Sequence, residues 1–331
     1  MYDAAGNEAS TIQNNNKLSL NEVRILVEKT SVHNGSQGNW NSMQQRDADT
    51  YVLAYTGWRS DGYIQTFDIN ANGSTITKKR SWEHDGCQGN YNSLVKVSDD
   101  VFALAYAGSS SDCYIRTFKV DASGNISSKK VKEHNTNYGI YNALTHLVGT
   151  TYVLAYTGAS NKGKMSTFTI PADGSSITIK KTINMDASFA AYNAIHKMTD
   201  STVVVVYQGR GPKFLMKTFQ ISSDGKTITE KKSETIYEGK AHWNAIAQVD
   251  ANTYVIATQG KDDDGYLYTY DVAPDGSSIA KVTELEFDDV RSKHHTLYNA
   301  GSNSFVLTHT GTASTDTVSY THLTLPTILL V

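Results

Sequence analysis

Short hydrophobic runs separated by turn residues set the pattern of this chain. One run, TYVLAYTG at 50–57, recurs in similar form at 101–108, 151–158, 202–209, 253–260 and 304–311. Inside the first copy, bulky side chains at Tyr51, Leu53 and Tyr55 alternate with smaller ones. This alternation, together with the abundance of Val, Thr and Tyr, predicts β-strands that are buried on both faces, and no segment has a helical period.

Each of these runs belongs to a unit of four strand-like runs. In the first unit an aromatic–Asn pair comes first, TYVLAYTG second, GYIQTFDI third at 62–69, and STITKKR fourth. A Gly preceded by Asn, Ser or Asp separates the third and fourth runs at 72–73, 123–124, 173–174, 224–225 and 275–276. Such dipeptides favour the positive φ of tight hairpin turns, so the runs are predicted to be antiparallel neighbours.

The units repeat with an almost constant period. Their aromatic anchors are spaced by 51, 50, 51 and 51 residues and lie at Trp40, Tyr91, Tyr141, Tyr192 and Trp243. Four antiparallel strands in every 50 or so residues are typical of propeller blades, whose large and small faces pack on one another. We therefore predict an all-β protein, a β-propeller of six four-stranded blades. A β-solenoid is the alternative, although its turns are usually shorter.

The two ends of the chain are predicted to share the last blade. Residues 24–39 align with 75–90, around the fourth run of the first unit, and a unit opened by His294 keeps only its first two runs. An N-terminal strand at 23–39 would close the last blade and remove an exposed sheet edge. One propeller domain at 23–316 follows, after a poorly defined segment at 1–22, with blades near 40–90, 91–140, 141–191, 192–242, 243–293, and 294–316 plus 23–39.

The sequence leaves the repeat after Asp316. A third run is expected there, but the chain reads TVSYTHLTLPTILLV, which places a proline where a strand should run. The segment VSYTHLTLPTILLV resembles translated sequencing-adapter read-through, which can end reading frames in metagenomic assemblies. We expect 317–331 to be a non-native tail, with a divergent closing strand as the alternative. A seventh blade would follow if the native chain continued.

Composition narrows the classes of function. The net charge of the 331 residues is −3, no basic stripe indicates nucleic-acid binding, and no run approaches the roughly 20 apolar residues of a membrane span. The first residues, MYDAAGNEAS, lack a secretory signal. No metal or cofactor is predicted, because the acidic run at 262–264 lacks the spaced ligands of a calcium loop. We expect a monomer.

The aromatic–Asn pairs are the first candidate binding residues, expected at the mouth of a central channel. They are Trp40 and Asn41, Tyr91 and Asn92, Tyr141 and Asn142, Tyr192 and Asn193, and Trp243 and Asn244. Aromatic rings stack on the apolar faces of sugars and amides bind hydroxyls, so the pairs would form equivalent glycan sites. The alternative is structural, with the ring wedged between blades and the amide holding turn backbone.

The loops between the second and third runs are expected on the same face as these pairs. Trp58 beside Arg59 is their most unusual pair, since an exposed tryptophan needs a partner or a ligand, and we include both as candidate binding residues. Residues that break the repeat columns are instead the candidates for a single catalytic site. They are Arg59, Arg210, His242, His294 and His295.

Two other groups look reactive but have structural interpretations. His84 stands in a column that also holds His33, His134, Met185, Ile236 and Phe287, and a general base cannot be replaced by an apolar side chain. This column is therefore expected to fill a notch between blades. Cys87 and Cys113 lie in two loops predicted to share a face, so a disulfide between them is predicted, with two independent thiols as the alternative.

The runs VLAYTG, DGYIQTF and DGSSITIKK resemble propeller repeats in large secreted or surface proteins of environmental microbes, over residues 24–316. The resemblance implies a fold and an extracellular or cell-surface location, and no established activity. From the near-identity of the units we expect non-enzymatic, multivalent binding or adhesion, with glycans or a surface protein as partner. The alternatives are a polysaccharide lyase or hydrolase with one site over the channel, and a protein–protein scaffold.

Overall fold

The structure, a computed structural model, describes all residues except 1–18, 22–28, 302–303, 312–317 and 325–331. Its contacts divide the chain into two compact units. The larger unit comprises residues 26–205 and 219–230, and the smaller unit comprises 1–25, 206–218 and 231–331.

The described residues form six four-stranded sheets, and the predicted antiparallel four-stranded unit is confirmed. The larger unit contains β2 (Asn39–Gln45), β3 (Thr50–Thr56), β4 (Gly62–Ile69) and β5 (Ile76–Asp85); β6 (Asn90–Lys96), β7 (Val101–Ala107), β8 (Cys113–Val120) and β9 (Ile126–Asn135); and β10 (Ile140–Val148), β11 (Thr151–Thr157), β12 (Gly163–Thr169) and β13 (Thr178–Asp186). A fourth sheet has residues in both units and contains β14 (Ala191–Lys197), β15 (Thr202–Gly209), β16 (Lys213–Ile221) and β17 (Ile228–Tyr237). The smaller unit contains β18 (His242–Gln248), β19 (Thr253–Gln259), β20 (Gly265–Val272) and β21 (Ile279–Asp288); and β22 (Lys293–Gly301), β23 (Ser304–Thr310), β24 (Val318–Thr324) and β1 (Ser19–Asn21).

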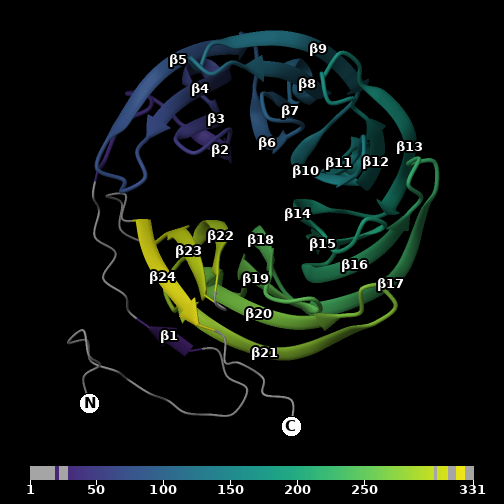
Figure 1. Cartoon of the computed structure of the whole chain (residues 1–331). Helices are drawn as coiled ribbons and strands as arrows, with labels where there is room; N and C mark the ends of the chain where they lie inside the picture. The colour runs from purple at the N-terminus through teal and green to yellow at the C-terminus, as the bar shows by residue number, and fades with distance from the viewer. Residues whose placement is uncertain (1–18, 22–28, 302–303, 312–317, 325–331) are drawn as a thin grey trace. The chain divides into compact units, whose positions relative to one another are not determined.

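Within the larger unit the first strand of each sheet lies on the inside and the fourth on the outside (Figure 1). The core lies between consecutive sheets, where the large face of one second strand meets the small face of the one before it. Ala103 and Ala105 of β7 share a buried cluster with Leu154 and Tyr156 of β11. Each fully buried Leu or aromatic side chain stabilises the fold by about 1.5–3 kcal/mol, so these faces carry much of the stability.

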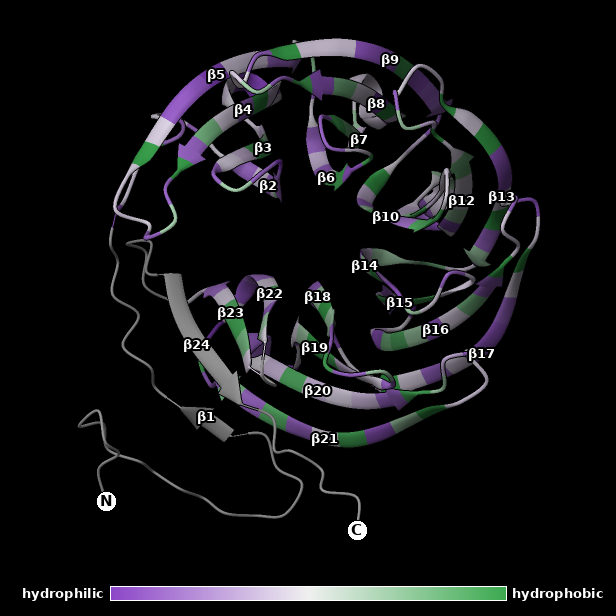
Figure 2. Ribbon diagram, viewed as in Figure 1, coloured by the Kyte–Doolittle hydropathy of each residue, from purple (hydrophilic) through white to green (hydrophobic). Residues whose placement is uncertain are grey.

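The outer strands are more polar than the second strands. Figure 2 shows hydrophilic positions along β5, β9 and β13, where most side chains are exposed. Lysines are common on these edge strands, and charge on an unpaired edge discourages pairing with another chain.

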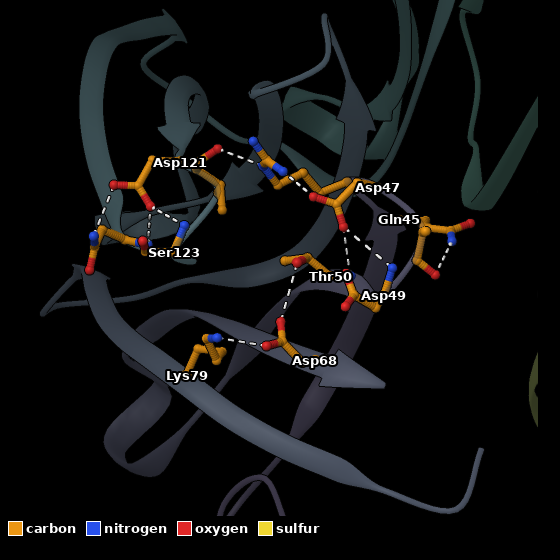
Figure 3. A network of polar contacts seen from close by, with 12 residues as sticks. Gln45, Asp47, Asp49, Thr50, Asp68, Lys79, Asp121 and Ser123 are labelled. Atoms are coloured by element: carbon orange, nitrogen blue, oxygen red, sulfur yellow. Dashed lines mark hydrogen bonds and ion pairs between the residues drawn. The ribbon is translucent and has the colours of Figure 1, made fainter. Parts of the chain in front are cut away.

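A network of short polar contacts ties the ends of the first sheet to the second (Figure 3). Asp47 accepts from the Thr50 backbone N–H at 2.9 Å, and Thr50 Oγ1 donates to Asp68, which also pairs with Lys79 at 2.6 Å. Arg46 pairs with Asp47 and donates through Nε to the Val120 carbonyl of the next sheet at 2.9 Å. These contacts hold the hairpin ends of neighbouring sheets together.

In four of the third strands, a threonine bonds to the turn glycine of the next repeat. The Oγ1 atoms of Thr66, Thr117, Thr167 and Thr218 donate to the carbonyls of Gly124, Gly174, Gly225 and Gly276, at 2.8, 2.6, 2.5 and 2.6 Å respectively. All eight residues are buried. We call this contact the threonine latch. It fixes the position of each hairpin turn on the preceding sheet.

Replacing Thr117 by Val should lower the free energy of unfolding by about 1–3 kcal/mol, because the buried Gly174 carbonyl would lose its donor while the volume stays the same. Chemical denaturation measures the change. Thr229→Val, at an exposed outer-strand position, is the matched control and should change stability by less than about 0.5 kcal/mol. Equal effects of the two substitutions would contradict the latch.

The last sheet differs from its prediction. β24 pairs with β23 in the place of a third strand, and β1 pairs with β24 in the place of a fourth. The predicted closing strand at 23–39 falls partly on residues 22–28, which lie outside the described residues, and 29–38 contain no strand. Those later residues instead form the loop that enters the first sheet, where the His33 carbonyl accepts from Gln65 at 3.2 Å. That 317–331 is non-native stays a prediction.

The histidine column fills notches between sheets, as expected. His84 is 4% exposed, its ring packs edge-on against Tyr106 at 4.7 Å, and neither ring nitrogen has a hydrogen-bond partner. Glycine at Gly62 leaves room for this ring, because a Cβ there would lie 2.5 Å from the His84 ring. Burial, with a smaller effect of Arg116, lowers the pKa of His84 from 6.5 to about 3.

This burial makes stability depend on pH. Because the unfolded chain binds a proton at His84 near pH 6.5 and the folded chain only near pH 3, stability is lost as the pH falls through this window. The slope is at most about 1.4 kcal/mol per pH unit for this residue. His84→Met, which copies Met185 of the same column, should reduce the slope by that amount in denaturation curves at pH 4–7. An unchanged slope would show that His84 is protonated in the folded protein.

Candidate functional site

The aromatic anchor of every repeat has left-handed backbone. The φ angles of Trp40, Tyr91, Tyr141, Tyr192, Trp243 and His294 lie between 52° and 57°. At five of the six, the register shifts between the first and second strands show a β-bulge at this point. A bulky side chain with positive φ costs about 1–3 kcal/mol, and bulges of this kind re-aim side chains at functional sites.

The asparagine after each anchor holds the entry turn. The Nδ2 atoms of Asn41, Asn92, Asn142 and Asn244 donate to the carbonyls of Gly38, Gly89, Gly139 and Ala241, three residues earlier, at 3.0–3.2 Å. Asn193 donates instead to the Tyr141 carbonyl at 3.1 Å. The structural interpretation of these amides is therefore supported. The Oδ1 atoms of Asn92, Asn142 and Asn193 are buried without a hydrogen-bond partner.

The anchors of the larger unit contact one another in sequence. The ring centroids lie 4.1 Å apart for Trp40 and Tyr91, 4.7 Å for Tyr91 and Tyr141, and 4.4 Å for Tyr141 and Tyr192. Burial and hydrogen bonding to Tyr192 and Tyr91 raise the pKa of Tyr141, so the Tyr141 hydroxyl stays protonated. The rings thus pack mainly on each other. Their role as ligand-binding residues stays a prediction.

The loops between second and third strands form short 3-10 turns and contact the next entry turn. η1 (Trp58–Ser60), η2 (Ser109–Ser111), η3 (Ala159–Asn161) and η4 (Lys261–Asp263) were predicted as loops. The backbone N–H groups of Gly89, Gly139, Ala190 and Ser292 donate to carbonyls at the ends of these turns, at 2.7–3.0 Å. Trp58 is 57% exposed and its partner is Arg59, whose guanidinium lies 4.1 Å from the ring centroid.

The predicted disulfide is absent. Cys87 is exposed and Cys113 is buried, and both are free thiols. Cys113 takes the place that glycine has in three other repeats, and its sulfur packs under the following entry loop, where a Cβ on Gly139 would lie 1.4 Å from it. Cys87 belongs to the preceding entry loop. That the two loops share a face is therefore not sufficient for a disulfide, because the Cys113 side chain points to the next repeat.

Alkylation should distinguish the two thiols. Without reductant, native protein treated with iodoacetamide should gain one label, on exposed Cys87, because burial of Cys113 blocks access and raises the pKa of its thiol. In denaturant the protein should gain two labels, which intact mass measures. An unlabelled mass in denaturant would show that the two cysteines form a disulfide after all.

The sixth repeat departs from the others at four linked positions. His294 and His295 replace the aromatic and Asn, Ser292 replaces the Gly or Ala of the entry turn, and His309 replaces the Tyr or Thr of the second strand. The side chains form a chain: Asp288 Oδ2 lies 3.4 Å from His309 Nδ1, which lies 3.0 Å from Ser292 Oγ, which lies 2.7 Å from His295 Nε2. We call the four connected residues, Asp288, His309, Ser292 and His295, the Ser–His network.

The backbone orients the protons of this network. His295 Nδ1 lies 2.8 Å from the Trp243 carbonyl, which can only accept, so Nδ1 carries the proton and Nε2 accepts from the Ser292 hydroxyl. Burial lowers the pKa of His295 to about 3, so the ring is neutral. Ser292 is 0% exposed and therefore cannot reach a substrate in this conformation. The network holds the start of β22 in place.

His294 is the member of this region that faces solvent. It is exposed, and its ring contacts Trp243 at a tilt of 43°, with a centroid distance of 3.9 Å. Burial of part of the ring, and Lys293 beside it, lower its pKa, so the imidazole is neutral at neutral pH. Half-buried His242 precedes Trp243, and burial followed by Lys240 lowers its pKa as well. The two neutral imidazoles can accept protons, and the indole ring beside them can bind an apolar face of a ligand.

Sequence reasoning found part of this region. It named His242, His294 and His295 as column breaks, and the structure places them in the smaller unit around Trp243. It missed Ser292, Asp288 and His309, although Ser292 and His309 also break their columns. Arg59 pairs with Trp58 in the larger unit. Within the described ranges, no three His, Cys, Asp or Glu side chains are grouped as metal ligands.

The fold is that of propeller-like proteins. No protein-family model matches the sequence, and no curated protein matches it in sequence. Among solved structures the chain is similar to a periplasmic gluconolactonase from Pseudomonas aeruginosa, with a TM-score of 0.62 and 10% identity over 84% of this chain and 86% of that one. Proteins assigned as 6-phosphogluconolactonases from Bacteroides fragilis and Bacteroides uniformis give TM-scores of 0.60 and 0.59, at 11% and 10% identity, over 84% and 82% of this chain and 82% and 80% of theirs.

These neighbours correct the expectation of a non-enzymatic, glycan-binding adhesion module. Three solved structures that share this fold are described as lactonases, which are enzymes. Near-identity of repeats therefore does not argue against catalysis on this scaffold, because one divergent repeat is sufficient for an asymmetric site. No helix among the described residues has the length and apolar character that crossing a membrane requires.

Proposed function

We propose that the chain is a hydrolase of sugar-derived esters, with sugar lactones as the first substrate class, acting at His294. The observation that carries the proposal is the replacement of the aromatic–Asn pair by His294 and His295 in one repeat only. A catalytic site needs one asymmetric constellation, whereas the four aromatic anchors of the larger unit pack on one another. The lactonase names of the structural neighbours support the substrate class.

The chemistry is general-base hydrolysis. Neutral His294 takes a proton from water as the water oxygen attacks the ester carbonyl carbon. When the tetrahedral intermediate collapses, the ester C–O bond breaks and the imidazolium returns its proton to the leaving alkoxide. The exposed part of Trp243 offers an apolar surface to a sugar ring, and the Ser–His network fixes the backbone that carries His294.

Three further expectations belong to this proposal. A blade count of six is supported by the six four-stranded sheets and by the β1–β24 pairing. An extracellular or periplasmic location is supported by the periplasmic neighbour. A polysaccharide ester or glycosidic substrate is the second candidate, and a rise in reducing ends would distinguish it from a small lactone.

His294→Gln should lower the rate of lactone hydrolysis by about 100-fold or more, the usual contribution of a general base. Activity of the unchanged protein should fall as the pH drops through the pKa of His294, which lies below its usual range, because protonation removes the base. A pH-stat with gluconolactone, corrected for the spontaneous rate, measures both.

His146→Gln is the matched control, because His146 lies in the larger unit and bonds to the Gly149 carbonyl at 2.9 Å. It should retain full activity. The proposal fails if purified protein hydrolyses neither lactones nor polysaccharide esters above the buffer rate. It also fails if His294→Gln and the unchanged protein have the same rate.

A further inference from the structure

Three tyrosines of the larger unit meet at the starts of consecutive first strands. Tyr91 lies in β6, Tyr141 in β10 and Tyr192 in β14, and all three are half-buried. The ring centroids of Tyr91 and Tyr141 are 4.7 Å apart, and those of Tyr141 and Tyr192 are 4.4 Å apart. We call these residues the tyrosine cluster. The repeat thus brings together oxidisable rings that are 50 and 51 residues apart in the sequence.

The phenol hydroxyls of the tyrosine cluster meet as well. The Tyr141 hydroxyl is hydrogen-bonded to those of Tyr192 and Tyr91, so the oxygen-bearing ends of neighbouring rings point toward one another. In a phenoxyl radical the unpaired electron is shared between the oxygen and the ring carbons ortho and para to it. Because the para carbon carries Cβ, two tyrosyl radicals join through their ortho carbons. The ring and hydroxyl contacts together bring these ortho carbons side by side.

The backbone holds the rings in this arrangement. The φ angles of Tyr91, Tyr141 and Tyr192 are 55°, 52° and 53°, in a region that bulky residues adopt only where the surrounding structure imposes it. β10 packs against both β6 and β14. The distances between the rings are therefore set by the packing of the sheets. A radical on one ring has a neighbour at a fixed, short distance, which favours coupling within the chain over coupling between chains.

We propose that the tyrosine cluster is a site of oxidative cross-linking, at which Tyr141 forms dityrosine with Tyr192 and, as second partner, with Tyr91. The pair Tyr141–Tyr192 is favoured because its rings are closer and their planes are inclined by 43°, against 65° for Tyr91–Tyr141. The reaction needs two equivalents of a one-electron oxidant, of the peroxyl-radical or high-valent metal class.

The atoms and electrons of this step balance. Each tyrosine gives one electron to the oxidant and its phenolic proton to solvent. The ortho carbons of the two radicals then form a C–C bond. Each of these carbons releases its proton and each oxygen regains one, which restores both phenols. The product has lost two hydrogen atoms in total.

The cross-link would join the first strands of consecutive sheets. The segment between Tyr141 and Tyr192 contains β11, β12 and β13, so the new bond closes a loop that holds the rest of one sheet. A covalent bond across a loop of this length restricts the unfolded chain more than the folded one. The cross-linked protein should therefore unfold at a higher temperature than the untreated protein.

One-electron oxidation of the full chain tests the proposal. Photogenerated tris(bipyridine)ruthenium(III), applied to dilute protein, should give a monomer fraction that has dityrosine fluorescence and a mass lower by two hydrogen atoms. Peptide mapping should join the peptide of Tyr141 to that of Tyr192 or Tyr91. The midpoint of thermal unfolding of this fraction should be higher than before oxidation.

Three conservative variants, checked for folding by near-ultraviolet circular dichroism, assign the cross-link. Tyr141→Phe should remove it, because Tyr141 is the ring that contacts both others. Tyr192→Phe should move it to the pair Tyr91–Tyr141. Tyr298→Phe is the matched control, because Tyr298 is 68% exposed, and it should leave the cross-link in the monomer unchanged. The proposal is overturned if oxidised monomer lacks dityrosine, if Tyr141→Phe gives the same yield as the unchanged protein, or if the bond maps to other tyrosines.

Discussion

The contact between the large face of one second strand and the small face of its predecessor is the interaction on which the rest depends. Tyr156 and Leu154 can approach Ala103 and Ala105 closely because alanine leaves room for them. Because consecutive sheets pack this closely, their turns, loops and latches must follow one another at nearly constant spacing along the sequence. The repeat period in the sequence is a consequence of this packing, since an insertion in one unit would shift every contact with the next.

Much of the architecture was readable for this reason. Alternation in TYVLAYTG and the Asp–Gly turns predicted strands and hairpins, because period-two burial and positive φ are local requirements of the backbone. The third strand of the first unit was predicted at 62–69 and found at Gly62–Ile69. The last sheet was predicted only in part. Its first two strands and an N-terminal fourth strand were expected, but its third strand has no counterpart in the repeat, and its fourth strand is three residues long and lies at Ser19–Asn21.

Residues of the candidate site could be predicted only where a residue of different chemistry interrupts a column of the repeat. His294 and His295 were found because they replace an aromatic and an amide that five units share. Ser292 and His309 also break their columns, but their joining His295 in one network could not be predicted, since the hydrogen bonds between these side chains depend on side-chain directions. The disulfide failed for the same physical reason: loop adjacency is a property of topology, whereas the Cys113 sulfur follows its own strand toward Gly139.

The left-handed anchor position has a consequence for how activity arises in such a protein. Trp40 and His294 share nearly the same φ, at 52° and 53°, so the backbone that presents a structural ring is the backbone that presents a titratable one. Exchanging one for the other requires no remodelling of the main chain. The scaffold thus offers several equivalent backbone positions for a reactive side chain. Single substitutions during evolution can place such a side chain in one repeat or another while the core stays intact.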